Sequence, residues 1–332
     1  MPLSLYLFTH FLKRYFSDCL GDSDDDGITL KSTTNYITEN VTITNCVISS
    51  HCNAIKLGTE SNGGFRNITI SNIVVKPSID TDPIFGYPQG ISGITLAMVD
   101  GGILEGITIS NIRIEGTHVP IYMRLGNRAR KYYEEQPQPK VGIFKNVMVS
   151  NVFATNVQSS IGCSITGIPG YNIQNISLND ISIEFPGNGT IEDAKKILPE
   201  LEDHYPESTK WGNLPAFGLY IRHVSNINLN NIELRLKNSD ARPAIVCDDV
   251  ENLKIIGLRT DSDSQVEKVI SFRNVRNAII QSCSILSKAN TFLELIGNQN
   301  KNISVISNVL VNVKRIIKNG MKTEIRESNN IK

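Results

Sequence analysis

The amino-acid sequence predicts an all-β protein folded as a single-stranded parallel β-helix, in which the chain winds through stacked coils of short strands. A motif of Asn followed by alternating apolar and polar residues recurs along the 332 residues. No copy of this motif has the periodicity of an amphipathic helix. The last copies begin at Asn252, Asn277 and Asn302, 25 residues apart, which is a typical length for one coil of a solenoid.

Each copy contains two short strands on either side of a polar corner, as in "NVTITNCVI" and "NITISNIVV". One such unit cannot bury its apolar face alone, so neighbouring copies must stack. The alternation then directs Ile43, Ile70 and Ile109 into the core. The copies begin, in chain order, at Asn40, Asn67, Gly106, Asn146, Asn175, Asn226, Asn252, Asn277 and Asn302.

The recurrent Asn residues are expected at matching corners of successive coils. There the side-chain amide of each can bond to the same residue one coil away and to the backbone of the turn. The residues expected in this position are Asn40, Asn67, Asn226, Asn252, Asn277 and Asn302.

Three insertions interrupt the repeat, between the copies that begin at residues 67 and 106, 106 and 146, and 175 and 226. In repeat proteins such insertions become loops, often on the binding face. The second contains the basic and aromatic stretch "MRLGNRARKYYEEQPQPK", and the third contains the only tryptophan. Arginine recognises carboxylates, and aromatic rings pack on sugar faces. We therefore expect Arg124, Arg128 and Trp211 to line a groove for an extended anionic polymer.

The composition bears on the binding partners that the protein can have. Lys plus Arg and Asp plus Glu both total 33, so no overall field would attract nucleic acid or an anionic membrane. No apolar run approaches membrane-spanning length. The six cysteines have no metal-ligand spacing and are expected to be small buried side chains. We expect no cofactor and no metal, and we expect the protein to be a monomer.

The N-terminus departs from the repeat. Residues 1–21, beginning "MPLSLYLFTHFLKRYF", have no strand alternation and no convincing signal peptide. We expect an atypical segment over residues 1–21, in place of missing first coils, and a β-helix domain over residues 22–332.

The stretch "DSDDDGITLKS", residues 22–32, places four aspartates directly before a strand. Asp is a poor strand former, and like charges repel, yet "ITLKS" alternates, with Thr29 and Lys31 on one face. A solvated turn, a disordered tail and a Ca²⁺ site are three ordinary interpretations, although EF-hand spacing is missing. His51 follows Asp26 by 25 residues, so a coil of that length predicts that its imidazole stacks beside the carboxylates.

Three stretches together, "DSDDDGITLKS", "NCVISSHCNAIKLGTESNGGFRNITISN" and "PIYMRLGNR", resemble the polygalacturonase-like glycoside hydrolases of family 28. The resemblance runs from about residue 22 through the last coils. It implies a right-handed parallel β-helix that hydrolyses pectic, uronic-acid-containing polysaccharide of the galacturonan or rhamnogalacturonan type with inversion. It also implies a secreted or periplasmic protein.

The resemblance implies roles for individual residues. Asp25 is expected to protonate the leaving oxygen, and Asp26 to help activate water. His51 is expected to tune the acid by a hydrogen bond, and Arg124 to grip the substrate carboxylate. Lys31, Arg128 and Trp211 are the remaining candidates for substrate binding.

The chain departs from the family pattern at a further aspartate, which the family carries one coil before the pair. The corresponding residues 1–10 contain no carboxylate, so we expect weak hydrolysis or none. Inverting hydrolysis also needs two carboxyls about 6.5–9.5 Å apart. A non-catalytic polysaccharide-binding or structural β-helix, and a Ca²⁺-dependent pectate lyase, are the alternatives.

Overall fold

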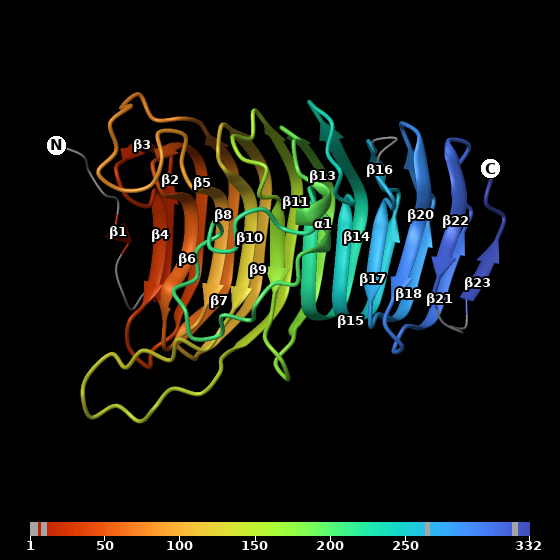
Figure 1. Ribbon diagram of the computed structural model, residues 1–332. Helices are drawn as coiled ribbons and strands as arrows, with labels where there is room; N and C mark the ends of the chain where they lie inside the picture. The colour runs from red at the N-terminus through yellow and green to blue at the C-terminus, as the bar shows by residue number, and fades with distance from the viewer. Residues whose placement is uncertain (1–5, 8–11, 263–265, 321–324) are drawn as a thin grey trace.

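The computed structural model describes residues 6–7, 12–262, 266–320 and 325–332. They form one long stack of coils, with the first strands at one end and the last strands at the other (Figure 1). The paired strands run parallel, each hydrogen-bonded to the equivalent strand of the next coil. The predicted parallel β-helix is confirmed.

The strands are β1 (Tyr6–Leu7), β2 (Leu12–Ser17), β3 (Leu20–Ser23), β4 (Ile28–Ser32), β5 (Thr38–Ser50), β6 (Asn53–Ser61), β7 (Gly64–Val75), β8 (Ser92–Met98), β9 (Ile103–Glu115), β10 (Val119–Leu125), β11 (Ile143–Thr155) and β12 (Cys163–Thr166). They continue as β13 (Ile173–Phe185), β14 (Leu219–Leu236), β15 (Ile245–Ile256), β16 (Arg259–Thr260), β17 (Ile270–Arg273), β18 (Arg276–Gln281), β19 (Ser284–Ile285), β20 (Ala289–Ile296), β21 (Lys301–Ile306), β22 (Val313–Asn319) and β23 (Ile325–Ser328). The helix described is α1 (Ile191–Lys195).

Alternating side chains build the core. Ile43, Ile70 and Ile109 are fully buried and lie side by side in the strand register, as predicted. Because successive side chains of a strand point to opposite faces, the same register leaves Thr44, Ser71 and their equivalents on the outside. The core is therefore a continuous column of stacked apolar side chains rather than one globular interior.

The predicted asparagine corners are also confirmed. Asn67 donates to Asn40 at 3.3 Å, Asn277 to Asn252 and Asn302 to Asn277, each from the side-chain amide to the next side-chain oxygen. The ladder residues have φ values of about 52–57°, in the left-handed region that Asn tolerates better than most residues. A second ladder, which was not predicted, links Asn45, Asn72, Asn111 and Asn151.

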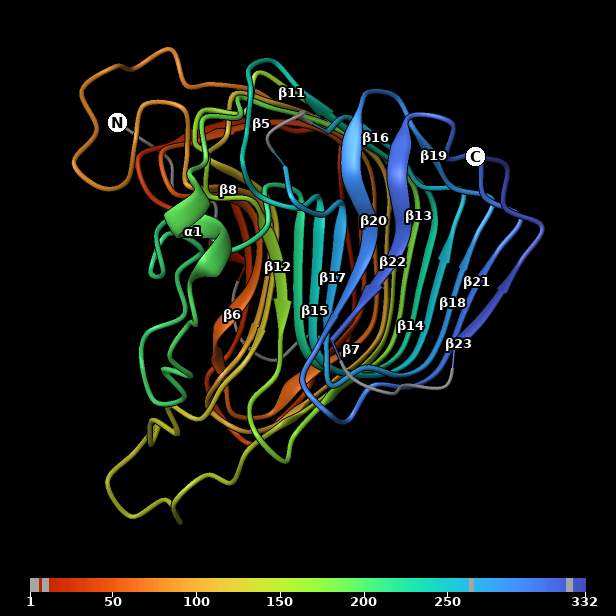
Figure 2. The same cartoon turned by 45° about the vertical axis from the view of Figure 1, so that its right-hand side comes forward.

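The insertions form loops at the predicted places. They are the first loop (residues 76–91), the second loop (residues 126–142) and the third insertion (residues 186–218), named the strap below. Figure 2 shows the strap, with α1 in it, standing off the outside of one face of the stack. This face, named the site sheet, is built from β4, β6, β8, β10, β12, the first residues of β14 and β15, and then β17, β20 and β22.

The expected atypical segment, residues 1–21, lies partly outside the described residues. Of its described strands, β1 pairs with β4, and β2 and β3 pair with β5. All six cysteines are free; Cys19 is half-buried and the others are buried. In the part of the chain that the structure describes, no helix is long and apolar enough to cross a membrane.

Candidate functional site

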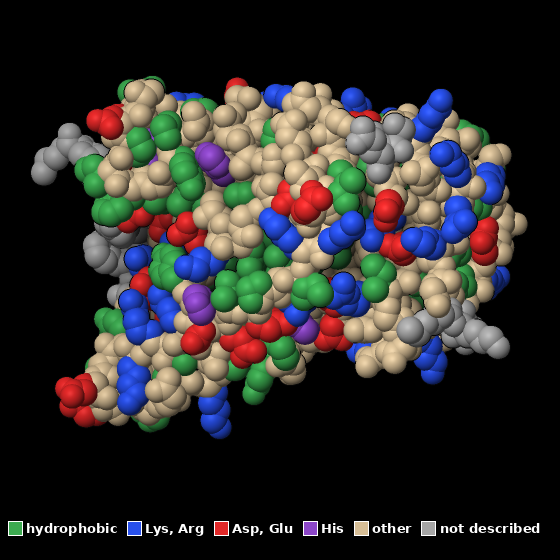
Figure 3. All heavy atoms as spheres, viewed as in Figure 1, with side chains coloured by type: hydrophobic (Ala, Val, Ile, Leu, Met, Phe, Trp, Pro, Cys, Tyr) green, Lys and Arg blue, Asp and Glu red, His purple; other side chains and the backbone are tan. Residues whose placement is uncertain are grey.

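The acidic turn, residues 24–27, joins β3 to β4 at the N-terminal end of the site sheet. Its backbone is held by hydrogen bonds: Asp26 N donates to Asp25 Oδ1 at 2.8 Å, and Ser50 Oγ donates to the carbonyl oxygen of Asp25 at 2.6 Å. The aspartates therefore stand in a built turn and do not have to fit the strand that follows. Figure 3 shows acidic, basic and histidine side chains intermixed on this face of the molecule.

Asp26 is fixed by the next coil. Its Oδ1 accepts from the side-chain amide of Asn53 at 2.7 Å and from the Asn53 backbone N–H at 3.2 Å. Its Oδ2 accepts from Lys56 Nζ at 2.7 Å. Asn53 is held in turn by the hydroxyls of Ser92 and Thr95, one coil further along.

Lys56 is a buried ammonium on β6, with only 6% of its side chain exposed. Burial alone lowers the pKa of this lysine, but the Asp26 carboxylate and the Tyr205 hydroxyl outweigh it and raise the pKa above its usual value. Lys56 and Asp26 therefore form a buried ion pair. Removing either partner alone leaves an unpaired buried charge, which destabilises the fold.

Asp24 pairs with His51. The Nδ1 of His51 lies 2.8 Å from Asp24 Oδ1, and its Nε2 lies 2.9 Å from the carbonyl oxygen of Asp80 in the first loop. Burial lowers the pKa of His51, but the bonds to Asp24 and Asp80 raise it above the usual value. The hydrogen bond to His51 lowers the pKa of Asp24.

This pairing differs from the expected one, in which His51 bonds to the catalytic acid Asp25. The coil is 27 residues long at this point, since Ile28 pairs with Ile55 in the register. Position 51 therefore stacks on position 24 rather than on position 26. The expected clustering of the histidine with the aspartates is present, but the carboxylate it contacts is Asp24.

Asp25 lies between these two fixed carboxylates, and it makes no ion pair with a cation among the described residues. One carboxylate oxygen each of Asp25 and Asp26 and the Sγ of Cys52 lie within 4.8 Å of one another. Burial, followed by the charges of Asp26 and Asp25, raises the pKa of the Cys52 thiol to about 12. The two carboxyls are closer together than the roughly 6.5–9.5 Å that an inverting pair needs to admit a water.

The predicted cations lie around this cluster and are paired. Lys31 Nζ lies 3.2 Å from a carboxylate oxygen of Glu60. Arg128 Nε donates to Asp100 Oδ1 at 2.9 Å, and Asp100 is completely buried. Their predicted contact with substrate stays a prediction, with the guanidinium of Arg128 oriented by Asp100.

Arg124 holds the strap. Its guanidinium donates to the carbonyl oxygens of Gly167, Glu200 and Leu201 at 2.6–3.2 Å, and the side chain is 3% exposed. The ring of Trp211 covers this guanidinium at 5.2 Å. Substrate binding by Arg124 and Trp211 stays a prediction; in this structure they contact each other at the middle part of the strap.

The strap carries Tyr205 to the acidic turn. The Tyr205 hydroxyl lies 3.4 Å from Lys56 Nζ, and its ring lies 5.6 Å from the guanidinium of Arg128. Sequence reasoning missed Lys56, Asn53 and Tyr205. The polar residue within the buried run "NAIKL" was a usable signal for Lys56, whereas no pattern pointed to Tyr205.

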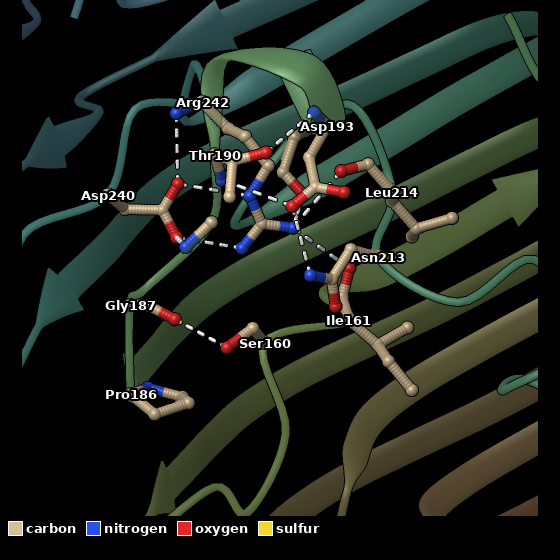
Figure 4. Close-up of polar contacts among 12 residues, drawn as sticks. Ser160, Ile161, Pro186, Gly187, Thr190, Asp193, Asn213, Leu214, Asp240 and Arg242 are labelled. Atoms are coloured by element: carbon tan, nitrogen blue, oxygen red, sulfur yellow. Dashed lines mark hydrogen bonds and ion pairs between the residues drawn. The ribbon is translucent and has the colours of Figure 1, made fainter. Parts of the chain in front are cut away.

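The base of the strap is anchored by the buried pair of Arg242 and Asp240 (Figure 4). Arg242 Nη1 donates to the carbonyl oxygen of Leu214 at 3.0 Å, and Asp240 Oδ2 accepts from Gly189 N at 2.9 Å. These bonds hold both ends of the strap to the turn between β14 and β15. The strap is therefore fixed by hydrogen bonds at both of its ends.

No protein-family model matches the chain, and no curated protein matches its sequence. Among solved structures, the chain is similar to the enzymatically active domain of tailspike protein 2 of bacteriophage CBA120, with a TM-score of 0.53 and 10% identity, over 94% of this chain and 42% of the tailspike chain. The chain thus spans less than half the length of that tailspike. This similarity concerns the fold, which is a parallel β-helix.

Two further solved structures resemble this chain more distantly. The lacto-N-biosidase of Eubacterium ramulus has a TM-score of 0.43 and 11% identity, over 89% of this chain and 51% of that chain. The mannuronan C-5 epimerase A-module of Azotobacter vinelandii has a TM-score of 0.41 and 8% identity, over 96% of this chain and 90% of that chain.

Proposed function

We propose that this protein is a glycoside hydrolase that cleaves uronate-containing polysaccharide at the acidic turn, with Asp25 as the proton donor. The observation that carries the proposal is the unequal engagement of three consecutive aspartates. Asp24 is held by His51 and Asp26 by Lys56. Asp25 alone of these three has no cationic partner, so it is the carboxyl free to exchange a proton with a bound sugar.

The surroundings support a substrate that is both anionic and a sugar. Lys31, Lys56 and Arg128 reach this end of the site sheet from three different coils. The half-exposed ring of Tyr205 offers a flat surface of the kind on which sugar rings pack. The tailspike domain of the same fold is described as enzymatically active, which is consistent with chemistry on this solenoid.

The stereochemical outcome of cleavage depends on a second carboxyl. Inversion requires a second carboxyl at about 6.5–9.5 Å from the acid, and Asp26 is both too near and fully engaged. We therefore assign Asp26 to holding the position of Lys56 and of the turn. Inversion, implied by the resemblance to the pectin hydrolases, stays a prediction that requires another water-activating group.

The test is reducing-end release from polygalacturonate by the wild-type chain and by Asp25→Asn. General acid catalysis is worth about 10²–10⁴-fold, so the substitution should lower the rate by that factor. Asp82→Asn, on the exposed part of the first loop, is the matched control and should leave the rate unchanged. Equal rates for Asp25→Asn and the wild type would contradict the assignment.

A second candidate function, polysaccharide binding without cleavage, is favoured by the close spacing of Asp25 and Asp26. It predicts that the chain binds oligogalacturonides tightly while releasing no reducing ends during long incubation. A calcium-dependent lyase fits less well, because the Lys56 ammonium already occupies Asp26 Oδ2 and a thiol is a poor ligand for Ca²⁺.

A further inference from the structure

A cavity opens on the site sheet, beyond the base of the strap. Its volume is about 190 Å³, and it lies between the end of α1 and the first residues of β14, β15 and β17. Its polar lining includes Lys195, Lys196, Lys268, Arg273, Asp248 and Ser271. Four of these six side chains are cations.

The cavity is separate from the acidic turn. In the strand register, Lys56 at the turn is related to Ser271 at the cavity through Thr95, Tyr122, Ser164, Tyr220 and Val246. These are six strand-to-strand steps of about 4.8 Å, so the two places lie about 29 Å apart along the solenoid. The strap covers the sheet between them (Figure 1).

Two of the four cations are already neutralised. Lys196 Nζ lies 2.6 Å from Asp193 Oδ1, and Lys268 pairs with Glu294. Lys195 and Arg273 differ, because neither side chain makes a hydrogen bond or an ion pair with another described residue. Two unpaired cations in one partly enclosed cavity favour an anionic ligand.

The remaining lining is suited to a sugar. Pro215, Pro243 and Val246 form apolar surface, and Tyr220 lies at the floor. The Ser271 hydroxyl is available to bond to hydroxyl groups. Asp248 Oδ2 lies 3.8 Å from Arg222 Nε, so Asp248 offers its other carboxylate oxygen. An apolar wall with a few polar groups is typical of pockets that bind small organic ligands.

We propose that this cavity binds a carboxylate-bearing sugar residue, a uronate, of a polysaccharide chain. Its carboxylate contacts Arg273 and Lys195, its hydroxyls contact Asp248 and Ser271, and its apolar ring face packs on the prolines. This inference rests on the substrate class of the proposed function, but it does not depend on catalysis at the acidic turn.

The test measures binding of tetragalacturonate by calorimetry to the non-cleaving Asp25→Asn chain, with and without Arg273→Ala. We expect Arg273→Ala to weaken binding roughly tenfold or more, since it removes a charge-assisted contact. Lys254→Ala is the matched control, because Lys254 lies exposed on the part of β15 that pairs with β18, outside the site sheet. It should leave binding unchanged. Identical affinity with and without Arg273→Ala would overturn the proposal.

Acetylation of lysines, followed by mass spectrometry, locates the ligand independently. Tetragalacturonate should protect Lys195 and leave Lys254 accessible, whereas a neutral tetraglucoside should protect neither. Protection of Lys195 by inorganic phosphate to the same extent would overturn the uronate assignment in favour of a general anion site.

The two proposals fail separately. Arg273-dependent binding without reducing-end release by the wild-type chain would support the cavity and contradict the hydrolase. Hydrolysis that depends on Asp25, together with unchanged binding in Arg273→Ala, would support the hydrolase and overturn the cavity.

Discussion

The aspartates of the acidic turn show how much of a residue's chemistry depends on its partner. Asp24, Asp25 and Asp26 are consecutive, yet each has a different environment: an imidazole, no cation, and a buried ammonium. Because the partners come from the next coil, the register assigns one role to each position. A shift of one residue would reassign every partner.

The ion pair of Lys56 and Asp26 is the first residue-scale prediction. Lys56→Met leaves the Asp26 carboxylate buried without its cation, which should lower the free energy of unfolding by about 3–5 kcal/mol. The measurement is the thermal unfolding temperature of the variant. Lys237→Met, which breaks an exposed pair with Glu184, is the control and should cost less than about 1 kcal/mol.

The double variant Lys56→Met with Asp26→Asn checks this explanation. It removes both charges, so part of the lost stability should return. A double variant no more stable than Lys56→Met would show that packing around the lysine stem, rather than the unpaired carboxylate, causes the loss.

The pair of His51 and Asp24 predicts a dependence of stability on pH. The pKa of His51 is raised above 6.5, so its contribution is fully present below pH 6.5 and is lost as the pH rises through the folded value. The pKa of Asp24 is lowered below 3.8, so its contribution is present above pH 3.8 and is lost as the pH falls through the folded value. The pair therefore stabilises the fold most between about pH 4 and 6.5.

Thermal unfolding of the wild type and His51→Gln across pH 4 to 8 measures this effect. The difference between them should be largest near pH 5 to 6 and should shrink toward pH 8. His204→Gln, at an exposed pair with Asp203, should show a much smaller difference. A constant difference for His51→Gln would mean that the imidazole contributes by packing alone.

At the scale of elements, the strap is the part that departs most from the repeat. It begins after β13, includes α1 and returns at β14, and it is bound by main-chain carbonyls rather than by strand pairing. The buried groups that hold it, Arg124 and the pair of Arg242 and Asp240, lie on the solenoid below. The strap can therefore be loosened without removing any strand.

Arg124→Ala should free the strap while the solenoid stays folded. We expect limited proteolysis within residues 196–215 to become several-fold faster, because the bonds to Glu200 and Leu201 are lost. Arg113→Ala is a matched control: Arg113 also bonds to carbonyl oxygens and covers a ring, that of Phe153, but on the other side of the coil. Unchanged cleavage in Arg124→Ala would show that other bonds are enough to hold the strap.

At the scale of the whole molecule, the strands of each coil pair with those of the neighbouring coils, while the strap reaches further, to Lys56. Stability in such a solenoid is approximately a sum of local terms, so it should vary along the stack. A central strand such as β11 pairs on both sides, with β9 and β13. Near the C-terminal end, the described pairings of β22 and β23 are on one side only, with β20 and β21.

Hydrogen exchange should report this gradient. Amides of β9, β11 and β13 should exchange most slowly, and those of β22 and β23 much faster, because the end coils open without disturbing the centre. Mass spectrometry of peptides from these strands is the measurement. Uniform protection from β9 to β23 would indicate that the stack unfolds as one cooperative unit.

The sequence by itself determined the architecture. The Asn motif and its spacing predicted stacked coils, the inward isoleucines, the asparagine ladder and the positions of the three insertions. These features are local and repeated, so each copy confirms the others. Even the clustering of His51 with the aspartates followed from the repeat, although a coil of 27 residues rather than 25 moved its partner from the expected Asp25 to Asp24.

Only the tertiary structure decided how the candidate site is assembled. Tyr205 meets Lys56 across 149 residues of sequence, and Arg124 donates to the strap carbonyls of Glu200 and Leu201. Neither follows from periodicity, because the path of an inserted loop is set by a few specific bonds to distant residues. A repeat fixes the positions of its own members through identical neighbours, whereas an insertion has no equivalent elsewhere in the chain from which its path could be inferred.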